Sequence, residues 1–210
     1  MAYPLDLTVA LTGASQSQLY EWNKKGLLHP ELCDDRREGF LWSFRDLIAL
    51  RTFVKLRTDH SLQAIRKAMS NLRELNLTEH PASYTLVSDG DSVFLVEDEG
   101  AEATDLLKHN GQKIISNLDD IFRGFQHPNR VGEVVNFLSP RPKLEVNEHR
   151  LGGFPTIRGT RVAFDSVANL VADGSVPIES IGDFYPDVTA EDARDALSFM
   201  EQVEAKRGWA

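Results

Sequence analysis

Near the start of the chain, residues 13–28 read GASQSQLYEWNKKGLL and bring amide, hydroxyl, phenol and ammonium groups close together. Such side chains donate hydrogen bonds to base edges in a DNA groove and to phosphate oxygens. The candidates for base-edge or groove contacts are Gln16, Ser17, Tyr20 and Lys24. The candidates for phosphate contacts are Lys25, Arg36, Arg37 and Arg45. Ser15 and Gln18 lie in the same stretch and complete the set of candidate DNA-binding residues.

The sequence contains no comparable arrangement of residues that would indicate catalysis. The six histidines form no i, i+4 pair around an acid, and neither H-E-x-x-H nor C-x-x-C occurs. A P-loop and a G-x-S-x-G nucleophile elbow are also missing. Cys33 is the single cysteine, so it cannot form an internal disulfide or a cysteine metal site. The acidic runs at 97–99 and 119–120 are typical of solvated surfaces. We therefore expect no enzymatic activity, no metal and no cofactor.

A short helix must position the candidate DNA contacts. Ser15 and Gln18 fit the capping box S-x-x-Q, so a helix is predicted to begin at Ser15. Leu19 and Trp22 share its inner face, and the polar residues fall on its outer faces. Upstream, DLTVALT predicts another short helix, and the four-residue turn between them is typical of a helix-turn-helix whose second helix enters the major groove. An ordinary helical hairpin is the alternative.

A wing and two longer helices are predicted next. Residues 31–39 followed by 40–42 suit a small hairpin with Arg36 and Arg37 near its tip. Arginines at such a tip commonly contact phosphates, although here they could instead pair with the carboxylates around them. The capping signature S-x-x-D at 43–46 predicts the start of a helix. SLQAIRKAMSNLREL then has apolar residues at steps of three and four, which predicts a further helix.

These motifs together resemble a known domain. T-G-A-S, the aromatic Trp22, G-L-L-x-P and then F-L-W-S-F-R-D-L resemble the winged-helix DNA-binding domain of MerR-type regulators. The resemblance covers residues 1–78 and implies that they form a DNA-binding domain. Common members carry Arg then Tyr where this chain has Tyr20 and Glu21. No heptad run follows Leu77, so the dimerisation helix and effector domain of MerR-type activators are not expected.

Residues 79–140 change from helical to alternating patterning. SYTLV and SVFLVE predict a β-hairpin that turns at Asp89-Gly90, because this dipeptide supplies the positive φ angles of a tight turn. EDEGAEATD is predicted as an acidic loop, GQKIISNLDDIFRGF as a strand and a short helix, and NRVGEVVNFLSPRPK ends in a proline-marked linker. The hairpin offers an edge for pairing with a second subunit.

Residues 141–210 are predicted to form three helices introduced by a β-arm. The arm, GGFPTIRGTRVAF, reads as a short strand interrupted by a glycine. In the first helix, Asp165 is the predicted cap and Gly174 the stop. A second helix begins at Pro177, and the capping box at 189–192 begins the third.

This part also resembles a known family. The pattern G-x-P-x-I-x-G-T-R, then Y-P, then an amphipathic helix resembles the DUF433 family of domains of unknown function over roughly residues 145–205. Members are regarded as VapB-type antitoxins of VapBC-like modules, whose toxin is a PIN-type ribonuclease. The resemblance implies a toxin or dimer interface, for which the candidates are Arg158, Gly159, Thr160 and Arg161.

The arm arginines suggest how a toxin would be blocked. Guanidinium groups pair bidentately with carboxylates, and a PIN-type active site is a carboxylate cluster that holds a metal. Arg158 or Arg161 is therefore a candidate to enter that site. The alternative is that Arg161 ties the arm to an acidic helix of its own domain.

Charge separates the two ends of the chain. The net charge is −9, but residues 1–80 hold 11 basic against 10 acidic residues, and the acidity belongs to the remainder. A near-neutral domain with basic spots binds phosphate, whereas an acidic one repels it. We therefore expect DNA at the first third and protein partners at the later part. No apolar run approaches a membrane span and no signal sequence is present, so no membrane contact and a cytoplasmic location are expected.

The sequence thus predicts a mainly α protein with small β elements: an N-terminal winged helix-turn-helix, a middle β-hairpin section and a C-terminal trihelical domain preceded by a β-arm. The expected function is an antitoxin that neutralises a PIN-type ribonuclease and, as a homodimer, represses its own promoter. Two alternatives stand beside it: a dimeric transcriptional regulator with no toxin partner, and a protein-interaction adaptor.

Overall fold

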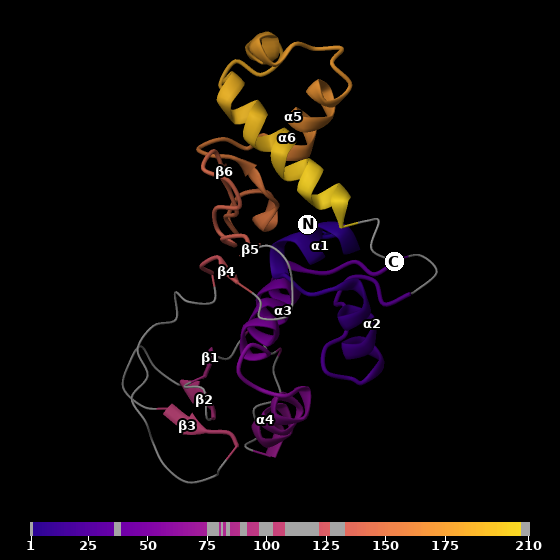
Figure 1. The fold of residues 1–210 in the computed structure, drawn as a ribbon, viewed down its shortest axis with the longest axis vertical. Helices are drawn as coiled ribbons and strands as arrows, with labels where there is room; N and C mark the ends of the chain where they lie inside the picture. The colour runs from indigo at the N-terminus through magenta and orange to yellow at the C-terminus, as the bar shows by residue number, and fades with distance from the viewer. Residues whose placement is uncertain are drawn as a thin grey trace.

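The computed structural model describes residues 2–35, 39–74, 80, 82, 85–88, 92–96, 103–107, 122–126 and 133–206. The described part is mainly helical, with small antiparallel strand pairs, as the sequence predicts. Along the long axis, α5 and α6 lie at one end, and α4 with β1–β3 lies at the other (Figure 1). Among the described residues, none of the helices combines the length and the apolar character needed to cross a bilayer.

Four helices form the N-terminal part: α1 (Leu5–Thr12), α2 (Gln16–Lys24), α3 (Phe44–Leu56) and α4 (Leu62–Glu74). Gly13, with φ 77°, ends α1 in the left-handed conformation that glycine adopts without a Cβ penalty. Complete capping boxes begin α2 and α3, which confirms both predictions. Leu19 and Trp22 are buried on the inner face of α2, and Trp22 meets Phe53 of α3 edge to face. The inner face of α2 is therefore packed on α3.

The wing is represented by isolated bridges instead of continuous strands. Cys33 pairs with Leu41 in antiparallel fashion, and Tyr3 pairs with Trp42. Residues 36–38, including the predicted tip arginines, lie outside the described residues. The second bridge joins the wing to the segment before α1, so the base of the wing is fixed by main-chain hydrogen bonds.

The middle section forms a three-stranded sheet in the order β1 (Thr85–Ser88), β2 (Val93–Val96) and β3 (Ala103–Asp105). Antiparallel pairing of β1 with β2 confirms the predicted hairpin strands, while the Asp89-Gly90 turn lies outside the described residues. The prediction of a loop through residue 105 is wrong, because β3 pairs with the other edge of β2. This strand forms by pairing with a neighbouring strand, so the local sequence of the acidic segment gives little indication of it.

Two further strands follow, β4 (Phe125–Gln126) and β5 (Glu133–Val134), which pair antiparallel. Most of the segment predicted as a strand and a short helix, residues 111–125, lies outside the described residues. Its described end, residues 122–125, supplies backbone carbonyls to the core of the N-terminal part, as shown below.

The C-terminal part contains a β-arm and three helical segments, as predicted. The arm pairs β6 (Leu144–Glu145) with β7 (Thr156–Ile157), with the 3-10 turn η3 (Leu151–Gly153) between them. The helical segments are α5 (Phe164–Ala172), the 3-10 helix η4 (Ile178–Asp183) and α6 (Ala190–Ala205). Asp165 is not the cap of α5: the cap is Ala163, two residues earlier, which is extended and whose side chain cannot accept a hydrogen bond.

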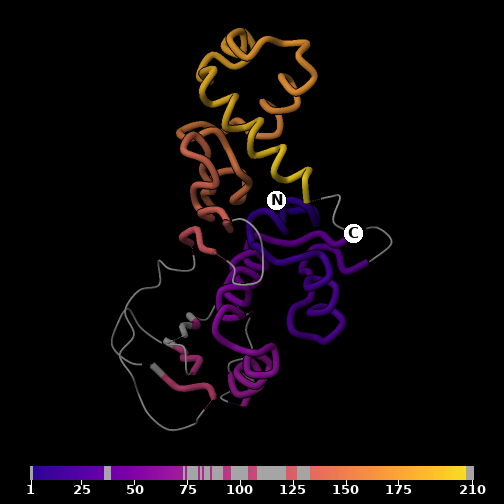
Figure 2. Tube along the Cα trace, viewed as in Figure 1, coloured from indigo at the N-terminus to yellow at the C-terminus, as the bar shows by residue number. Residues whose placement is uncertain are grey.

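A close backbone approach joins the two ends of the chain. The Tyr3 hydroxyl donates to the carbonyl of Gly152, and the Tyr3 ring packs on Phe154. Gly153, with φ 84°, leaves room for the Phe44 ring, which a Cβ there would approach to 2.3 Å. The trace shows α1 between the end of α6 and the top of α3 (Figure 2). The arm therefore packs directly on the N-terminal helices.

Arg51 of α3 is fully buried and links three segments through backbone carbonyls. Its guanidinium donates to the carbonyls of Leu11 and Val135, and to those of residues 122 and 123. The guanidinium also lies over the rings of Phe125 and Phe137, at 5.4 and 5.6 Å from their centroids. Burial lowers the pKa of Arg51 to about 9, so the group stays charged at neutral pH.

We expect Arg51→Met to lower the free energy of unfolding by about 3 kcal/mol or more, because buried carbonyls would lose their donors. Chemical denaturation followed by circular dichroism measures this change. Arg66→Met, at an exposed position of α4, is the control and should change stability by less than about 0.5 kcal/mol. Equal stability of the two variants would contradict a central role for Arg51.

Candidate nucleic-acid interface

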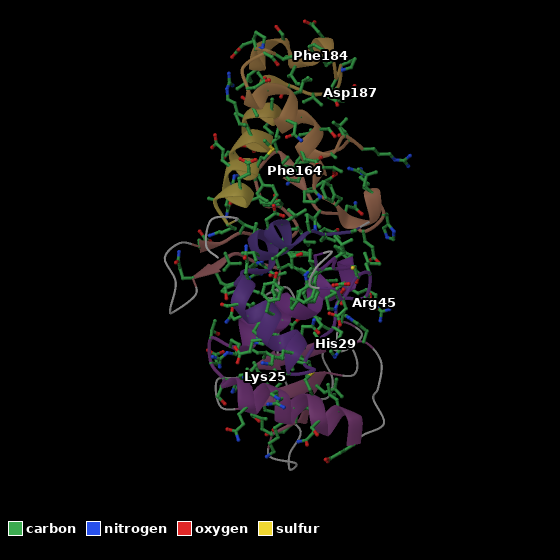
Figure 3. The ribbon with its side chains drawn as sticks, turned by 90° about the vertical axis from the view of Figure 1, so that its right-hand side faces the viewer. Lys25, His29, Arg45, Phe164, Phe184 and Asp187 are labelled. Atoms are coloured by element: carbon green, nitrogen blue, oxygen red, sulfur yellow. The ribbon has the colours of Figure 1, made fainter. Side chains whose placement is uncertain are left out.

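The outer face of α2 presents a polar stripe to solvent. Ser17, Glu21 and Lys24 are exposed and follow one another at steps of four and three residues, so they share one side of the helix. Leu19 and Trp22 hold the opposite side in the core. Lys25, His29 and Arg45 lie on the same half of the molecule, as seen in Figure 3. The helix is therefore anchored in the core on one face and exposed to solvent on the other.

Several of the candidate DNA contacts already have partners within the protein. Ser15 and Gln18 complete the capping box of α2. The Gln16 amide donates to the backbone carbonyl of Lys206 at the end of α6, 3.1 Å away. Tyr20 is half-buried, with its ring 5.0 Å from that of Phe40. Ser17 and Lys24 are thus the predicted groove residues that the structure leaves exposed on the stripe.

The cationic candidates differ in how far their charge is compensated. Lys25 forms an ion pair with Glu21, and this ammonium group holds the pKa of the Glu21 carboxyl below its usual value. Arg45 is exposed, with its guanidinium 3.9 Å from the carboxylate of Glu31. Arg36 and Arg37 lie outside the described residues. Lys24 is therefore the exposed cation of α2 that has no ion pair with a described residue.

A small side-chain network, which sequence reasoning missed, joins the wing to α2. The Asn23 amide donates to the carboxylate of Asp34, and the Asn23 carbonyl oxygen bonds to the His29 ring. His29 Nδ1 also lies 3.3 Å from Asp34. The only sequence signal was the position of Asn23 and His29 on either side of the turn at Gly26. This network fixes the angle between the wing and α2.

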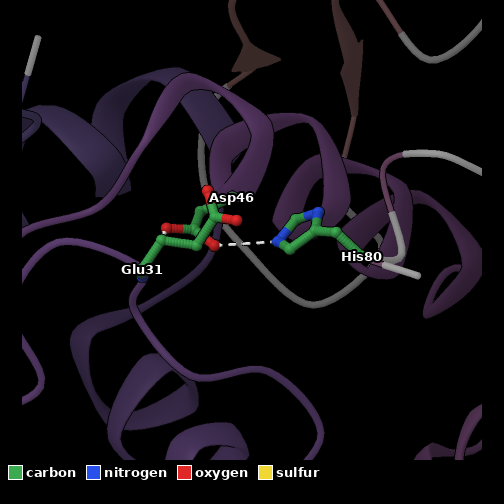
Figure 4. A group of neighbouring side chains, drawn as sticks. All are labelled: Glu31, Asp46 and His80. Carbon is green, nitrogen blue, oxygen red and sulfur yellow. Dashed lines mark hydrogen bonds and ion pairs between the residues drawn. The ribbon is translucent and has the colours of Figure 1, made fainter. Parts of the chain in front are cut away.

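A second network centres on Asp46, the last residue of the α3 capping box (Figure 4). Its Oδ2 accepts from the backbone N–H groups of Ser43 and Glu31, at 2.8 and 3.0 Å. Its Oδ1 lies 3.0 Å from His80 Nε2. The Ser43 hydroxyl in turn donates to Glu31. One buried carboxylate therefore joins the wing entry, the start of α3 and the segment after α4.

Glu31, Asp46 and His80 could in principle hold a metal, since their ligand atoms all lie within 4.8 Å of one another. The backbone N–H of Ala82 donates to His80 Nδ1 at 3.2 Å, which assigns the ring proton to Nε2, facing Asp46. A metal on Nε2 would move that proton to Nδ1, where it would meet the Ala82 N–H. The hydrogen bonds therefore fit an Asp46–His80 pair better than a metal centre.

The predicted interface residues of the β-arm fall into two groups. The Arg158 guanidinium donates to the carbonyls of Pro142 and Leu144 and to the Ser139 hydroxyl, so it holds the arm together. Gly159 and Thr160 form the turn of the arm, Gly159 with φ 79°. Arg161 is exposed and makes no ion pair or hydrogen bond with a described residue.

The arm is tied to acidic α6 by residues that sequence reasoning did not select. Arg141 donates to the Ser198 hydroxyl and to the Gln202 side chain, and the backbone N–H of Lys143 donates to Asp195. The Lys143 ammonium also pairs with Glu191 at 2.9 Å, which raises the pKa of Lys143. Two basic residues close before the arm, in the stretch PRPK, were the available signal. The contact between the arm and an acidic helix, which was predicted for Arg161, is thus made by Arg141 and Lys143.

We expect Asp46→Asn to lower the free energy of unfolding by about 1–3 kcal/mol, because an amide has one acceptor oxygen for two sets of donors. Asp192→Asn is a matched control at the same position of the α6 capping box, where one carboxylate oxygen makes the bonds to Thr189. An asparagine there keeps that oxygen, so the loss should be smaller. Equal losses in thermal or chemical unfolding would mean that His80 adds nothing to the network.

Comparison with known proteins assigns the C-terminal part. Residues 144–200 match the family model described as protein of unknown function DUF433. The crystal structure of Rv2018 from Mycobacterium tuberculosis is similar in fold, with a TM-score of 0.51 and 15% identity, covering 93% of this chain and 96% of that chain. No curated protein matches the chain in sequence. We call this matched part the DUF433 domain; it contains both arm strands, β6 and β7, together with α5, η4 and most of α6.

Proposed function

We propose that this protein is a DNA-binding antitoxin: its N-terminal part represses its own promoter, and its DUF433 domain neutralises a PIN-type ribonuclease. The observation that carries the DNA-binding half is the polar stripe of α2, anchored by Leu19 and Trp22 and flanked by the wing. A helix presented in this way places short polar and basic side chains in a major groove. Ser17 and Lys24 are the proposed groove contacts, and Arg45 a proposed phosphate contact.

Repression in this proposal requires positioning and no chemistry. A homodimer with two-fold symmetry would place two copies of α2 in successive major grooves, about 34 Å apart, and so occupy a promoter. The near balance of charge in residues 1–80 fits a modest affinity, which Lys24, Lys25 and the arginines of the wing would raise locally.

The toxin-binding half rests on the DUF433 match and on the charge of this domain. Residues 165–206 carry ten carboxylates against Arg194 and Lys206, which disfavours a second nucleic-acid site and favours a protein partner. Arg161 is exposed at the turn of the arm, where its guanidinium can meet a carboxylate of a partner. VapB-type antitoxins, which this domain resembles, act on PIN-type ribonucleases.

One contact favours the alternative of a protein-interaction adaptor. Gln16, at the first turn of α2, is bound to Lys206 at the end of α6, so the part of the helix that would enter a groove first lies against the C-terminal part of the chain. A regulator with no toxin would share the DNA-binding face and use the DUF433 domain for oligomerisation alone. The two experiments below separate these cases.

We expect the protein to bind its own promoter in a salt-dependent manner, and Arg45→Gln to weaken that binding uniformly across sequences, because Arg45 is the proposed phosphate contact. Loss of one phosphate contact should reduce the slope of log K against log salt by about 1. Fluorescence anisotropy with a labelled promoter duplex at several salt concentrations measures both. Arg194→Gln, in the DUF433 domain, is the control and should bind as the unmodified protein does. No promoter binding at low salt would favour the adaptor.

We expect the protein to form a stoichiometric complex with a PIN-type ribonuclease encoded beside its gene and to silence that nuclease. Co-purification followed by an RNA cleavage assay tests this directly. Arg161→Ala should weaken inhibition, because the arm guanidinium would no longer pair with the carboxylates of the nuclease. Promoter binding without any inhibition of the ribonuclease would leave a dimeric regulator.

A further inference from the structure

The end of α6 is bound to the first turn of α2, the helix proposed to enter DNA. The side-chain amide of Gln16, the first residue of α2, donates to the backbone carbonyl of Lys206, 3.1 Å away. Lys206 is the C-cap of α6 and follows Ala205, the last residue of that helix. The two partners are 190 positions apart in sequence, so the contact joins the N-terminal and C-terminal parts of the chain.

This hydrogen bond satisfies a group that a helix end leaves without a partner. The last four carbonyls of an α-helix have no N–H group within the helix from which to accept. The Gln16 amide supplies such a donor to the carbonyl of Lys206, and Gln16 is half-buried. The contact therefore stabilises the position of α6 against α2, which we call the docked position.

The neighbouring helix α1 also contacts α6. The two helices pack against each other, and the trace shows α1 between the end of α6 and the top of α3 (Figure 2). Every residue of α1 from Asp6 to Thr12 is buried. In the docked position, α6 therefore contacts both helices of the pair that is proposed to meet DNA.

A major groove has no room for α2 and the end of α6 together. The groove is about 12 Å wide, and an α-helix with its side chains is about 10–12 Å across. In a helix-turn-helix, the N-terminal residues of the second helix reach the base edges. These residues are Gln16 and Ser17 in α2, and Lys206 lies within hydrogen-bond distance of Gln16. The docked α6 would therefore collide with the wall of the groove.

The end of α6 can leave this position without unpacking the core. Val203 is the last buried side chain of α6, whereas Glu204 and Ala205 are exposed. Segments with few buried apolar contacts, such as helix ends, open most readily. Undocking therefore needs the loss of one hydrogen bond and the fraying of the last turn, while Val203 holds the rest of the helix.

We propose that the end of α6, residues 204–206, is an autoinhibitory element that must leave the first turn of α2 before α2 enters DNA. DNA and the end of α6 then compete for the same place. The apparent affinity for DNA is reduced in proportion to the fraction of molecules in which α6 is undocked. This inference rests on the proposed DNA binding by α2 and adds its control by the C-terminal part of the same chain.

Ala205→Pro in the full-length protein tests the proposal without changing any charge. Proline at this exposed position removes a backbone N–H and collides with the carbonyl of Glu201, so it ends α6 before Lys206. We expect this variant to bind a labelled promoter duplex about two- to tenfold more tightly than the unmodified protein, as expected when one hydrogen bond that competes with DNA is lost. Fluorescence anisotropy at one fixed salt concentration measures the change.

Two controls separate the contact from its surroundings. Ala172→Pro places the same residue at the exposed last position of α5 and should change the affinity for DNA by less than about twofold. Lys206→Gln removes the ammonium group but keeps the carbonyl that Gln16 binds, so it should bind DNA no more tightly than the unmodified protein.

Hydrogen exchange gives a second measurement on the unmodified protein. The backbone N–H of Lys206 donates to the carbonyl of Val203 at 3.1 Å in the docked position. If this turn frays when α2 enters the groove, the amides of Ala205 and Lys206 should exchange faster in the presence of promoter DNA than in its absence.

The outcomes separate this inference from the proposal of DNA binding. Tighter binding by Ala205→Pro but not by the controls, with an unchanged circular dichroism spectrum and faster exchange at the end of α6, supports autoinhibition. Binding by Ala205→Pro alone also supports it, because inhibition would then be complete. If the unmodified protein binds the promoter and Ala205→Pro binds equally or more weakly, autoinhibition is overturned and DNA binding stands. If neither protein binds at low salt, both proposals fall.

Discussion

The buried guanidinium of Arg51 is the interaction on which the rest of this structure depends. It donates to backbone carbonyls at the end of α1, in the segment before β4 and just after β5. Aromatic rings of Phe125 and Phe137 cover the charge. A buried cation is costly unless its donors are used, and here they are used to hold irregular backbone.

Fixing that backbone also fixes the DUF433 domain against the helices that carry the polar stripe. Phe137 packs on Phe44, which in turn fills the space left by Gly153, while Tyr3 holds the carbonyl of Gly152. The N-terminal and C-terminal parts therefore share a packed junction instead of a loose linker. The α2 face and the DUF433 domain therefore belong to one packed body.

The two networks near α2 show how a local motif gains a wider role. The S-x-x-D box of α3 and the T-x-x-D box of α6 are equivalent in sequence, yet only Asp46 also holds Glu31 and His80. Likewise, the sequence shows Asn23 only as a polar residue of a helix, but its side chain binds Asp34 and His29. In both cases the extra partners come from the wing or from the segment after α4, and they orient the surface proposed to meet DNA.

The sequence by itself determined the helices, their starts at the capping boxes, the β1–β2 hairpin strands and the three helical segments of the DUF433 domain. These features depend on hydrogen bonds and apolar spacing within a few residues, so they can be predicted from a single sequence. Only the tertiary structure decided that Arg51 is buried, that β3 joins the sheet, that Gln16 meets Lys206, and that Arg141 instead of Arg161 ties the arm to α6. The partners of Arg51 lie between 40 and 84 residues away. Contacts over such separations depend on how the elements pack, and no local pattern of residues encodes them.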